Sequence, residues 1–199
     1  DEDTIRFSTW NAQVKGGEVV DMYAFRAIIK KKNPHHDKYY EKLLREVKKK
    51  KPIKVKTGGN CAWFFFMADW QLGKKDLGVD ETIKLIRRGI QNGKKQLKDL
   101  AKQGFVVKEI YLIGLGDLIE NCYGFFKHQS FNVSLTKSEQ EHLTRVMILE
   151  ILDSFLTKAE KIVLGGVPGN HGENRAGKGE VVTNRLDNAD TACIQIVGE

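Results

Sequence analysis

Long hydrophobic runs, cysteine pairs and a leader-like N-terminus are all missing from this sequence of 199 residues. No apolar stretch approaches the roughly 20 residues that a membrane span requires, so we expect no membrane partner. The first residues, DEDTIRFSTW, are acidic and lack the apolar core of a secretory signal peptide. The three cysteines are widely spaced and form no CxxC pair, which fits a reducing compartment better than a disulfide framework. We therefore expect a cytoplasmic protein.

The positive charge of the chain is concentrated in one segment, residues 30–56. This segment holds twelve Lys or Arg residues and three acidic ones, a local balance of +9, whereas the whole chain carries +7. Two interpretations stay open: a solvated, partly helical linker, or a tether that follows the phosphates of a nucleic acid. The candidate contacts to nucleic acid are Lys48, Lys49, Lys50 and Lys51.

The basic segment also divides the chain into parts. Before it, two β-leaning runs flank a Lys-Gly-Gly-Glu stretch at 15–18, which predicts a small β-hairpin appendage over 1–29. Residues 30–58 are then a basic linker or tether. The main domain covers 59–199.

The main domain alternates between short apolar runs and helical patterns. The predicted strands cover 61–68, 106–115 and 161–167, with a fourth over 192–197. The predicted helices cover 80–102, a stretch that starts near Ser138, and residues 180–188. Ser138 and Glu141 have the spacing of a capping box. This alternation predicts an α/β fold with a mostly parallel sheet and right-handed helical crossovers.

Polar side chains follow each of the first three predicted strands. Asp69 and Gln71 follow the first strand, Asp117 follows the second, and Asn170 and His171 follow the third. Because the carboxyl ends of parallel strands share one edge of a sheet, we expect these side chains to converge there. A single aspartate after a strand mostly caps a helix, but three successive strand ends with oxygen and imidazole donors indicate metal binding. Two such ions can clamp a phosphoryl group and activate a water molecule.

The stretches ADWQLGK, GLGDLIENC and VPGNHGENR at these strand ends resemble the calcineurin-like metallophosphoesterase family. The resemblance covers about 61–175, and its most specific parts are the Gly-Asn-His turn and Gly116-Asp117. The motifs are also similar to phosphoesterases of phages and prophages and to relatives that act as DNA-repair nucleases. The resemblance implies that the main domain is the N-terminal half of a metallophosphoesterase-type α/β sandwich.

The resemblance also implies a role for each residue at the strand ends. Asp69 and Gln71 would bind the first metal ion, Asp117 would bridge both ions, and Asn170 would bind the second. His171 would stabilise or protonate the leaving oxygen while a metal-bound hydroxide attacks phosphorus. The implied cofactors are two divalent metal ions, with manganese favoured and magnesium, iron or zinc as alternatives. The glycines of the last motif would let the backbone turn sharply.

Four neighbouring residues are further candidates. Glu120 and Asn121 would position Asp117. His128 is a candidate substrate contact. Arg175 would either contact a phosphate or pair with an acidic side chain.

Two features depart from the family pattern. Gln71 stands where the family has histidine, and a neutral amide oxygen is a weaker ligand, which predicts a weak first metal site. His171 is the last histidine of the chain, although the family supplies further histidines downstream. We expect either a fragment of a longer enzyme, which the missing initial Met favours, or a degenerate relative.

Together these features predict a metal-dependent phosphoesterase, and in particular a phosphodiesterase or nuclease that acts on nucleic acid. The residues after Asp117 read LIENC, unlike the GDxxDRG signature of protein phosphatases, and the basic segment fits a polyanionic partner. The alternative is a non-catalytic nucleic-acid-binding or structural protein that keeps a degenerate phosphoesterase scaffold. For a phage-encoded protein, the compartment would be the cytoplasm of the host.

Overall fold

The computed structural model describes residues 5–13, 19–27, 37–54, 61–125, 127–176 and 179–199. The chain forms two compact units, Asp1–His36 and Asp37–Glu199. In the first unit, β1 (Ile5–Gln13) pairs antiparallel with β2 (Val19–Ala27). This pairing is the hairpin that the two β-leaning runs predict, and the predicted turn at 15–18 lies outside the described residues.

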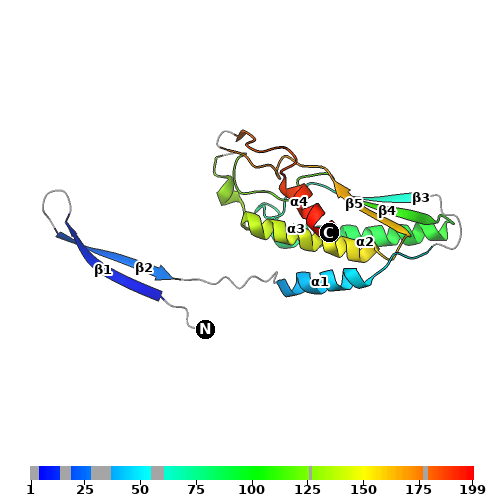
Figure 1. Ribbon diagram of the computed structural model, residues 1–199, viewed down its shortest axis with the longest axis horizontal. Helices are drawn as coiled ribbons and strands as arrows, with labels where there is room; N and C mark the ends of the chain where they lie inside the picture. The colour runs from blue at the N-terminus through cyan, green and yellow to red at the C-terminus, as the bar shows by residue number, and fades with distance from the viewer. Residues whose placement is uncertain (1–4, 14–18, 28–36, 55–60, 126, 177–178) are drawn as a thin grey trace. The chain divides into compact units, whose positions relative to one another are not determined.

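The second unit is built on a three-stranded parallel sheet in the order β3-β4-β5 (Figure 1). The strands are β3 (Cys61–Met67), β4 (Val107–Gly114) and β5 (Lys161–Gly166). Three helices follow the strands: α2 (Val79–Lys102) between β3 and β4, α3 (Lys137–Phe155) between β4 and β5, and α4 (Ala189–Gly198) after β5. The prediction of an α/β fold with a parallel sheet and helical crossovers is confirmed.

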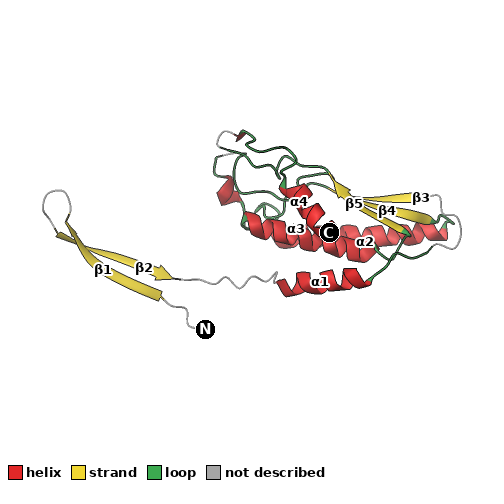
Figure 2. Ribbon diagram, viewed as in Figure 1, coloured by secondary structure: helices red, strands yellow, loops and turns green. Residues whose placement is uncertain are grey.

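The three helices pack on one face of this sheet (Figure 2). Trp63 of β3 packs against Phe155 of α3 with ring centroids 5.2 Å apart, and its indole N–H donates to Gln96 of α2 at 2.9 Å. The missing side chain of Gly166 admits α4, because an added Cβ would lie 2.4 Å from Cδ1 of Ile194. The hydrophobic core lies between the two layers. Fully buried core side chains include Met67, Ile110, Leu112, Leu143, Met147 and Ile151.

The other face of the sheet carries aromatic side chains that are exposed in the described structure. Phe64 is 48% and Phe66 is 59% exposed. Phe64 stacks on Tyr111 of the neighbouring strand, with ring centroids 4.8 Å apart. The sheet therefore buries its apolar side chains mainly on its helix-covered face.

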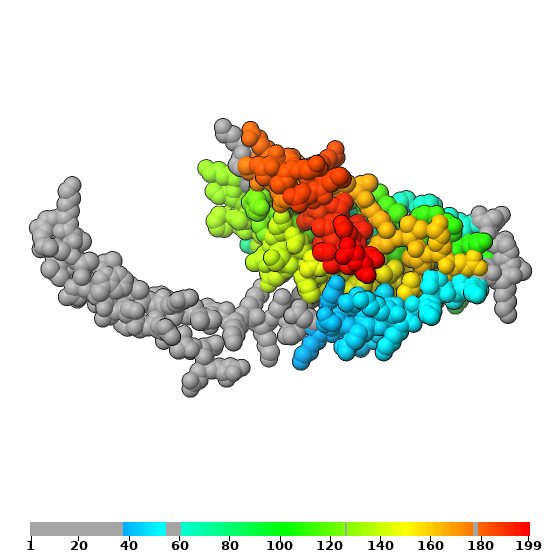
Figure 3. Space-filling model, viewed as in Figure 1, coloured from blue at the N-terminus to red at the C-terminus, as the bar shows by residue number. Residues whose placement is uncertain are grey.

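Helix α1 (Asp37–Lys49) lies inside the predicted basic linker, 30–58, and packs against α3 (Figure 3). Leu43 of this helix is buried in the core cluster. Just after the helix, the ammonium of Lys50 pairs with the carboxylate of Asp153 at 2.5 Å. This part of the basic segment is thus a docked helix rather than a free tether.

Two predictions near the C-terminal end are wrong. Residues 180–188 form loops and turns instead of a helix, and 192–197 belong to α4 instead of a strand. A short apolar run such as ACIQIV is compatible with either structure. Here Asn188 selects the helix, because its side chain caps it by accepting the Asp190 N–H at 3.0 Å.

The start of α3 also differs from the prediction. The capping box is formed by Thr136 and Glu139, two residues before the expected pair Ser138 and Glu141. The Thr136 hydroxyl accepts the Glu139 N–H at 3.3 Å, and the Glu139 carboxylate accepts the Thr136 N–H at 2.8 Å. Both pairs have the required spacing, so the pattern alone did not distinguish them. None of the helices among the described residues is long and apolar enough to cross a membrane.

Candidate functional site

The three parallel strands end in register at one edge of the sheet, and the loops that follow them are bonded to one another. The Asp69 N–H donates to the carbonyl oxygen of Gly116 at 3.3 Å, and the Gln71 N–H donates to that of Asp117 at 3.0 Å. The His171 N–H donates to Oδ1 of Asp117 at 2.8 Å. The structure therefore brings the three strand-end motifs together at one edge, as the sequence predicts.

The backbone of these loops is strained. Asp69, Gln71, Asp117 and Asn121 have φ values of 51°, 42°, 55° and 66°, and His128 in the next loop has 76°. A left-handed conformation costs about 1 kcal/mol for a residue with a side chain. Such strain persists only where the surrounding structure enforces it, and it clusters at functional sites. The concentration of strain at the strand ends makes this edge the candidate site.

A buried carboxylate, absent from the sequence-based candidates, fastens the loops together. Asp190 is fully buried, and its Oδ2 accepts the backbone N–H groups of Asp117 at 2.9 Å and Gly169 at 3.2 Å. Its Oδ1 accepts those of Leu118 at 3.0 Å and Ile119 at 3.3 Å. Burial raises the pKa of Asp190, while these backbone donors oppose the rise. Asp190 thus ties the turn after β5 to the turn after β4.

The glycines of the Gly-Asn-His turn are required by close contacts. A Cβ added to Gly169 would lie 2.1 Å from the amide nitrogen of Asp117, and one added to Gly172 would lie 2.2 Å from Oδ1 of Asn188. The chain turns here, with the Glu173 N–H 3.4 Å from the Asn170 carbonyl, but neither glycine has a positive φ, so close packing is what requires them. The Asn188 side chain also donates to the Gly169 carbonyl at 2.7 Å. Asn170 remains exposed at this turn.

The imidazole of His171 is held on several sides. Its Nδ1 lies 3.0 Å from the carbonyl oxygen of Glu120 and 3.4 Å from the Glu120 carboxylate. Its ring stacks on Phe125 with centroids 4.5 Å apart and planes 14° apart. The Asn121 amide donates to the His171 carbonyl at 3.0 Å. Glu120 and Asn121, expected to position Asp117, therefore make these contacts with His171 instead.

Glu120 is nearly fully buried, with 2% of its surface exposed. Burial raises the pKa of its carboxyl, and the nearby His171 partly offsets this rise. Its Oε2 has no hydrogen-bond partner among the described residues apart from the ion-pair contact with His171. A buried acid facing an imidazole can stabilise a positive charge on that ring.

Arg175 pairs with an acid, which resolves the alternative left open by the sequence. Its Nε and Nη2 donate to Glu173 at 3.0 and 2.7 Å, and its guanidinium lies 4.2 Å from the centroid of Phe125. His128 is exposed, with its ring 5.9 Å from that of Phe131. No hydrogen bond or ring contact between described residues joins His128 to the strand-end motifs.

The carboxamide of Gln71 has partners on both sides. The Lys74 ammonium donates to its Oε1 at 3.0 Å, and its Nε2 lies 3.4 Å from Nε2 of His171. The oxygen that would bind a metal ion is therefore already used by a cation. The ammonium disfavours a second cation on this oxygen, but the oxygen keeps another lone pair, so the ligand role that the resemblance implies for Gln71 stays a prediction.

The remaining oxygen donors fit a hard divalent ion in their chemistry. Asp69 and Asn170 are exposed, and Asp117 uses one carboxylate oxygen for the His171 N–H. Carboxylate and amide oxygens are the donors that Mg²⁺ and Mn²⁺ prefer. Across the described ranges, no group of three His, Cys, Asp or Glu side chains is placed to hold a metal ion. The donor types thus fit such an ion with the amide of Asn170 included, and the two-metal site stays a prediction.

The predicted nucleic-acid contacts divide into two kinds. Lys48, Lys49 and Lys51 are exposed, whereas Lys50 is half-buried in its ion pair with Asp153. Only the first three are available to phosphates.

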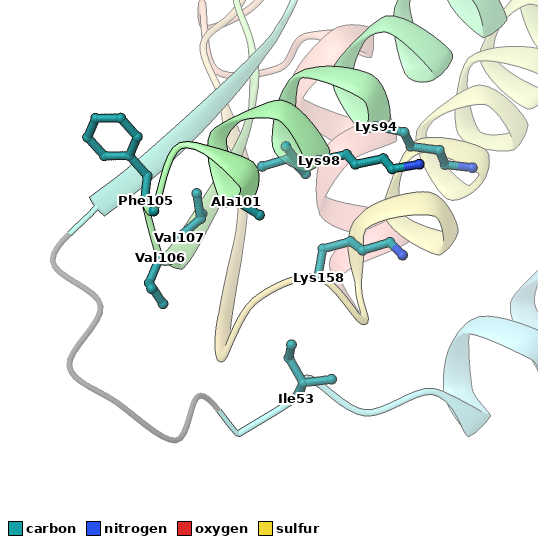
Figure 4. Close-up of a pocket in the computed structure, with 10 residues that line it drawn as sticks. Ile53, Lys94, Lys98, Ala101, Phe105, Val106, Val107 and Lys158 are labelled. Atoms are coloured by element: carbon teal, nitrogen blue, oxygen red, sulfur yellow. The ribbon is translucent and has the colours of Figure 1, made fainter.

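Two cavities lined by described residues are relevant to the location of the site. One of about 290 Å³ adjoins Asp69 and is lined partly by Trp70 and Leu77. A larger one, of about 620 Å³, lies between the end of α2, Ile53 and Lys158 (Figure 4). The larger cavity includes none of the strand-end residues, so cavity size does not locate the candidate site.

Comparisons of the chain with protein-family models, with curated proteins and with solved structures found no match in any of the three. The function is therefore inferred from the chemistry of the strand-end site.

Proposed function

We propose that the strand-end site hydrolyses phosphoesters with a divalent metal ion, as the resemblance to calcineurin-like metallophosphoesterases implies. The observation that carries this proposal is the contact of Asp117 with His171 inside loops that are strained and tied by buried Asp190. A fold gains no stability from left-handed aspartates at strand ends, so the arrangement is best explained by chemistry.

Each side chain of the site has a proposed role. Asp69, Asp117 and Asn170 would hold the ion, which when bound would polarise the phosphoryl group and activate water. His171, fixed by Phe125 and Glu120, would exchange a proton with the reacting oxygens. Gln71 is left out of the ligand set.

Nucleic acid is the proposed substrate. Lys48, Lys49 and Lys51 extend from the end of α1 into solvent, where they can contact a phosphate backbone. The segment that carries them is docked on the same unit as the strand-end site. A polyanion bound there would be held by the domain that performs the reaction.

The test is hydrolysis of bis-(p-nitrophenyl) phosphate by the full chain with Mn²⁺. Asp117→Asn keeps an oxygen that can accept the His171 N–H but removes the charge that binds the ion, so it should lose most of the activity. The matched control is Asp187→Asn, an exposed aspartate whose carboxylate accepts from Asn174 at 3.2 Å. Equal activity of the two variants would refute the assignment.

The alternative function is a nucleic-acid-binding or structural protein with a degenerate site. The hydrogen bond from Lys74 to Gln71 favours it, because this bond occupies a position where the resemblance expects a metal ligand. DNA binding without hydrolysis in Mn²⁺, Mg²⁺, Fe²⁺ or Zn²⁺ would support this alternative against the enzyme.

A further inference from the structure

We propose that Lys74, acting through Gln71, fixes the hydrogen of His171 on Nδ1 and so makes Nε2 a proton acceptor. This inference deepens the proposed function and rests on it for its catalytic meaning. Lys74 is a positioning residue in this scheme, because it acts on His171 only through the carboxamide of Gln71.

The assignment follows from which groups can donate and which can accept. The Lys74 ammonium can only donate, so the Gln71 atom 3.0 Å away must be the carbonyl Oε1. The other atom of the carboxamide is then the NH₂ group, which also can only donate. The ring nitrogen of His171 that faces it at 3.4 Å is Nε2, and a donor in this position favours a lone pair on that nitrogen.

The opposite side of the ring leads independently to the same tautomer. Nδ1 of His171 lies 3.0 Å from the backbone carbonyl of Glu120, which can only accept. The Glu120 carboxylate, at 3.4 Å, is a second acceptor when ionised. The hydrogen therefore belongs on Nδ1, and the lone pair on Nε2.

The participants are held in place by other contacts. The Gln71 N–H is bonded to the Asp117 carbonyl, and the Lys74 N–H donates to the Gln71 carbonyl at 3.1 Å. The Lys74 ammonium also lies 3.9 Å from the Asp76 carboxylate. The stack on Phe125 opposes rotation of the imidazole.

This arrangement changes the role that the resemblance gives to His171. An imidazole with a lone pair on Nε2 accepts a proton before it can donate one to a leaving oxygen. In that step the O–H bond of water or a phosphate hydroxyl breaks, an N–H bond forms at Nε2, and the positive charge falls beside Glu120. The Gln71 contact is long for a hydrogen bond at 3.4 Å, so an incoming O–H group can replace it.

The test is the tautomer itself, measured by long-range ¹H–¹⁵N correlation on the ¹⁵N-labelled full chain without metal. His171→Gln identifies the His171 signals by their disappearance. The wild-type chain should show its hydrogen on Nδ1. Gln71→Glu should add a hydrogen at Nε2 while Nδ1 keeps its own, because a carboxylate only accepts and the Glu120 carbonyl still faces Nδ1. The near-identical shape of the side chain guards against misfolding.

Two variants of Lys74 test whether its hydrogen bond to Gln71, and not positive charge in general, sets the tautomer. Lys74→Met should shift the tautomer ratio about tenfold toward Nε2–H, which corresponds to ~1.4 kcal/mol, whereas Lys74→Arg should preserve it. The matched control is Lys75→Met, because Lys75 donates to the Phe131 carbonyl at 2.6 Å and leaves Gln71 alone.

Three outcomes would overturn the inference: a wild-type hydrogen on Nε2, a Gln71→Glu spectrum like wild type, or equal shifts in the two lysine-to-methionine variants. The measurement requires no activity. Failure to detect hydrolysis would therefore count against the proposed function and leave the positioning role of Lys74 to be decided by the spectra.

Discussion

Replacing Asp190 by asparagine removes one acceptor from the centre of the strand-end site and changes almost nothing else in size. The carboxylate accepts four backbone N–H groups, two on each oxygen. In the variant, one oxygen keeps two of these bonds. The NH₂ group that replaces the other oxygen is itself a donor and faces the remaining two N–H groups without bonding them.

The magnitude follows from the orphaned donors. A buried donor left without a partner costs about 1–3 kcal/mol, so two of them should lower the free energy of unfolding by about 3 kcal/mol. Relaxation of the loops or entry of a water molecule would reduce this loss of stability, so we take a value near the low end of the range for two donors. A surface aspartate changed to asparagine should cost less than about 0.5 kcal/mol.

The assay is urea unfolding followed by tryptophan fluorescence, with Asp187→Asn as the exposed control. A lower midpoint at unchanged slope is the expected result for Asp190→Asn, because only stability should change. A variant indistinguishable from the control would refute the reasoning that Asp190 ties the turns together. Activity should fall with stability, since the same bonds place Asp117 and Gly169.

Three further predictions concern other parts of the molecule. Burial raises the pKa of the Cys193 thiol to about 12, so this cysteine should resist a thiol reagent at pH 8 until the chain unfolds, as peptide mapping of the labelled protein can check. Burial, together with the hydrogen bond to Glu150, raises the pKa of Tyr39 to about 12. The contribution of Tyr39 to stability should therefore be complete below pH 10 and lost as the pH rises toward 12. Tyr39→Phe should remove a late step from the ultraviolet titration of the protein. Changing Lys48, Lys49 and Lys51 to glutamine should flatten the salt dependence of DNA binding by up to about 2.7 in log–log slope, and an unchanged slope would exclude them as phosphate contacts.

Much of the fold could be predicted because its elements have strong local patterns. The apolar face of α2 repeats at helical spacing through Ile83, Ile86 and Ile90, and all three are buried. The strand β3 reads as one continuous apolar run. The last helix was missed because six apolar-rich residues do not distinguish helix from strand, and its cap at Asn188 is bonded to a turn distant in sequence.

The candidate site could be predicted in its location but less in its contacts. Strand polarity alone brings Asp69, Asp117 and His171 to one edge. The hydrogen bond from Lys74 to Gln71 depends on the conformation of the turn between them. The hydrogen bonds of Asp190 depend on how α4 packs on the sheet. Neither is encoded in a spacing, so the sequence offered no signal for them beyond the polar residues before α4.

The strain at the strand ends and the buried Asp190 are parts of one arrangement. A left-handed Asp117 costs about 1 kcal/mol, and the N–H groups exposed by that turn would cost more if buried without acceptors. Asp190 supplies those acceptors, but only when α4 is docked, which in turn requires Gly166 to leave space for Ile194. The turn that orients Asp117 toward the His171 N–H is therefore stable only after α4 has packed onto the sheet, so the chemistry of this edge depends on a helix that carries none of the proposed metal ligands.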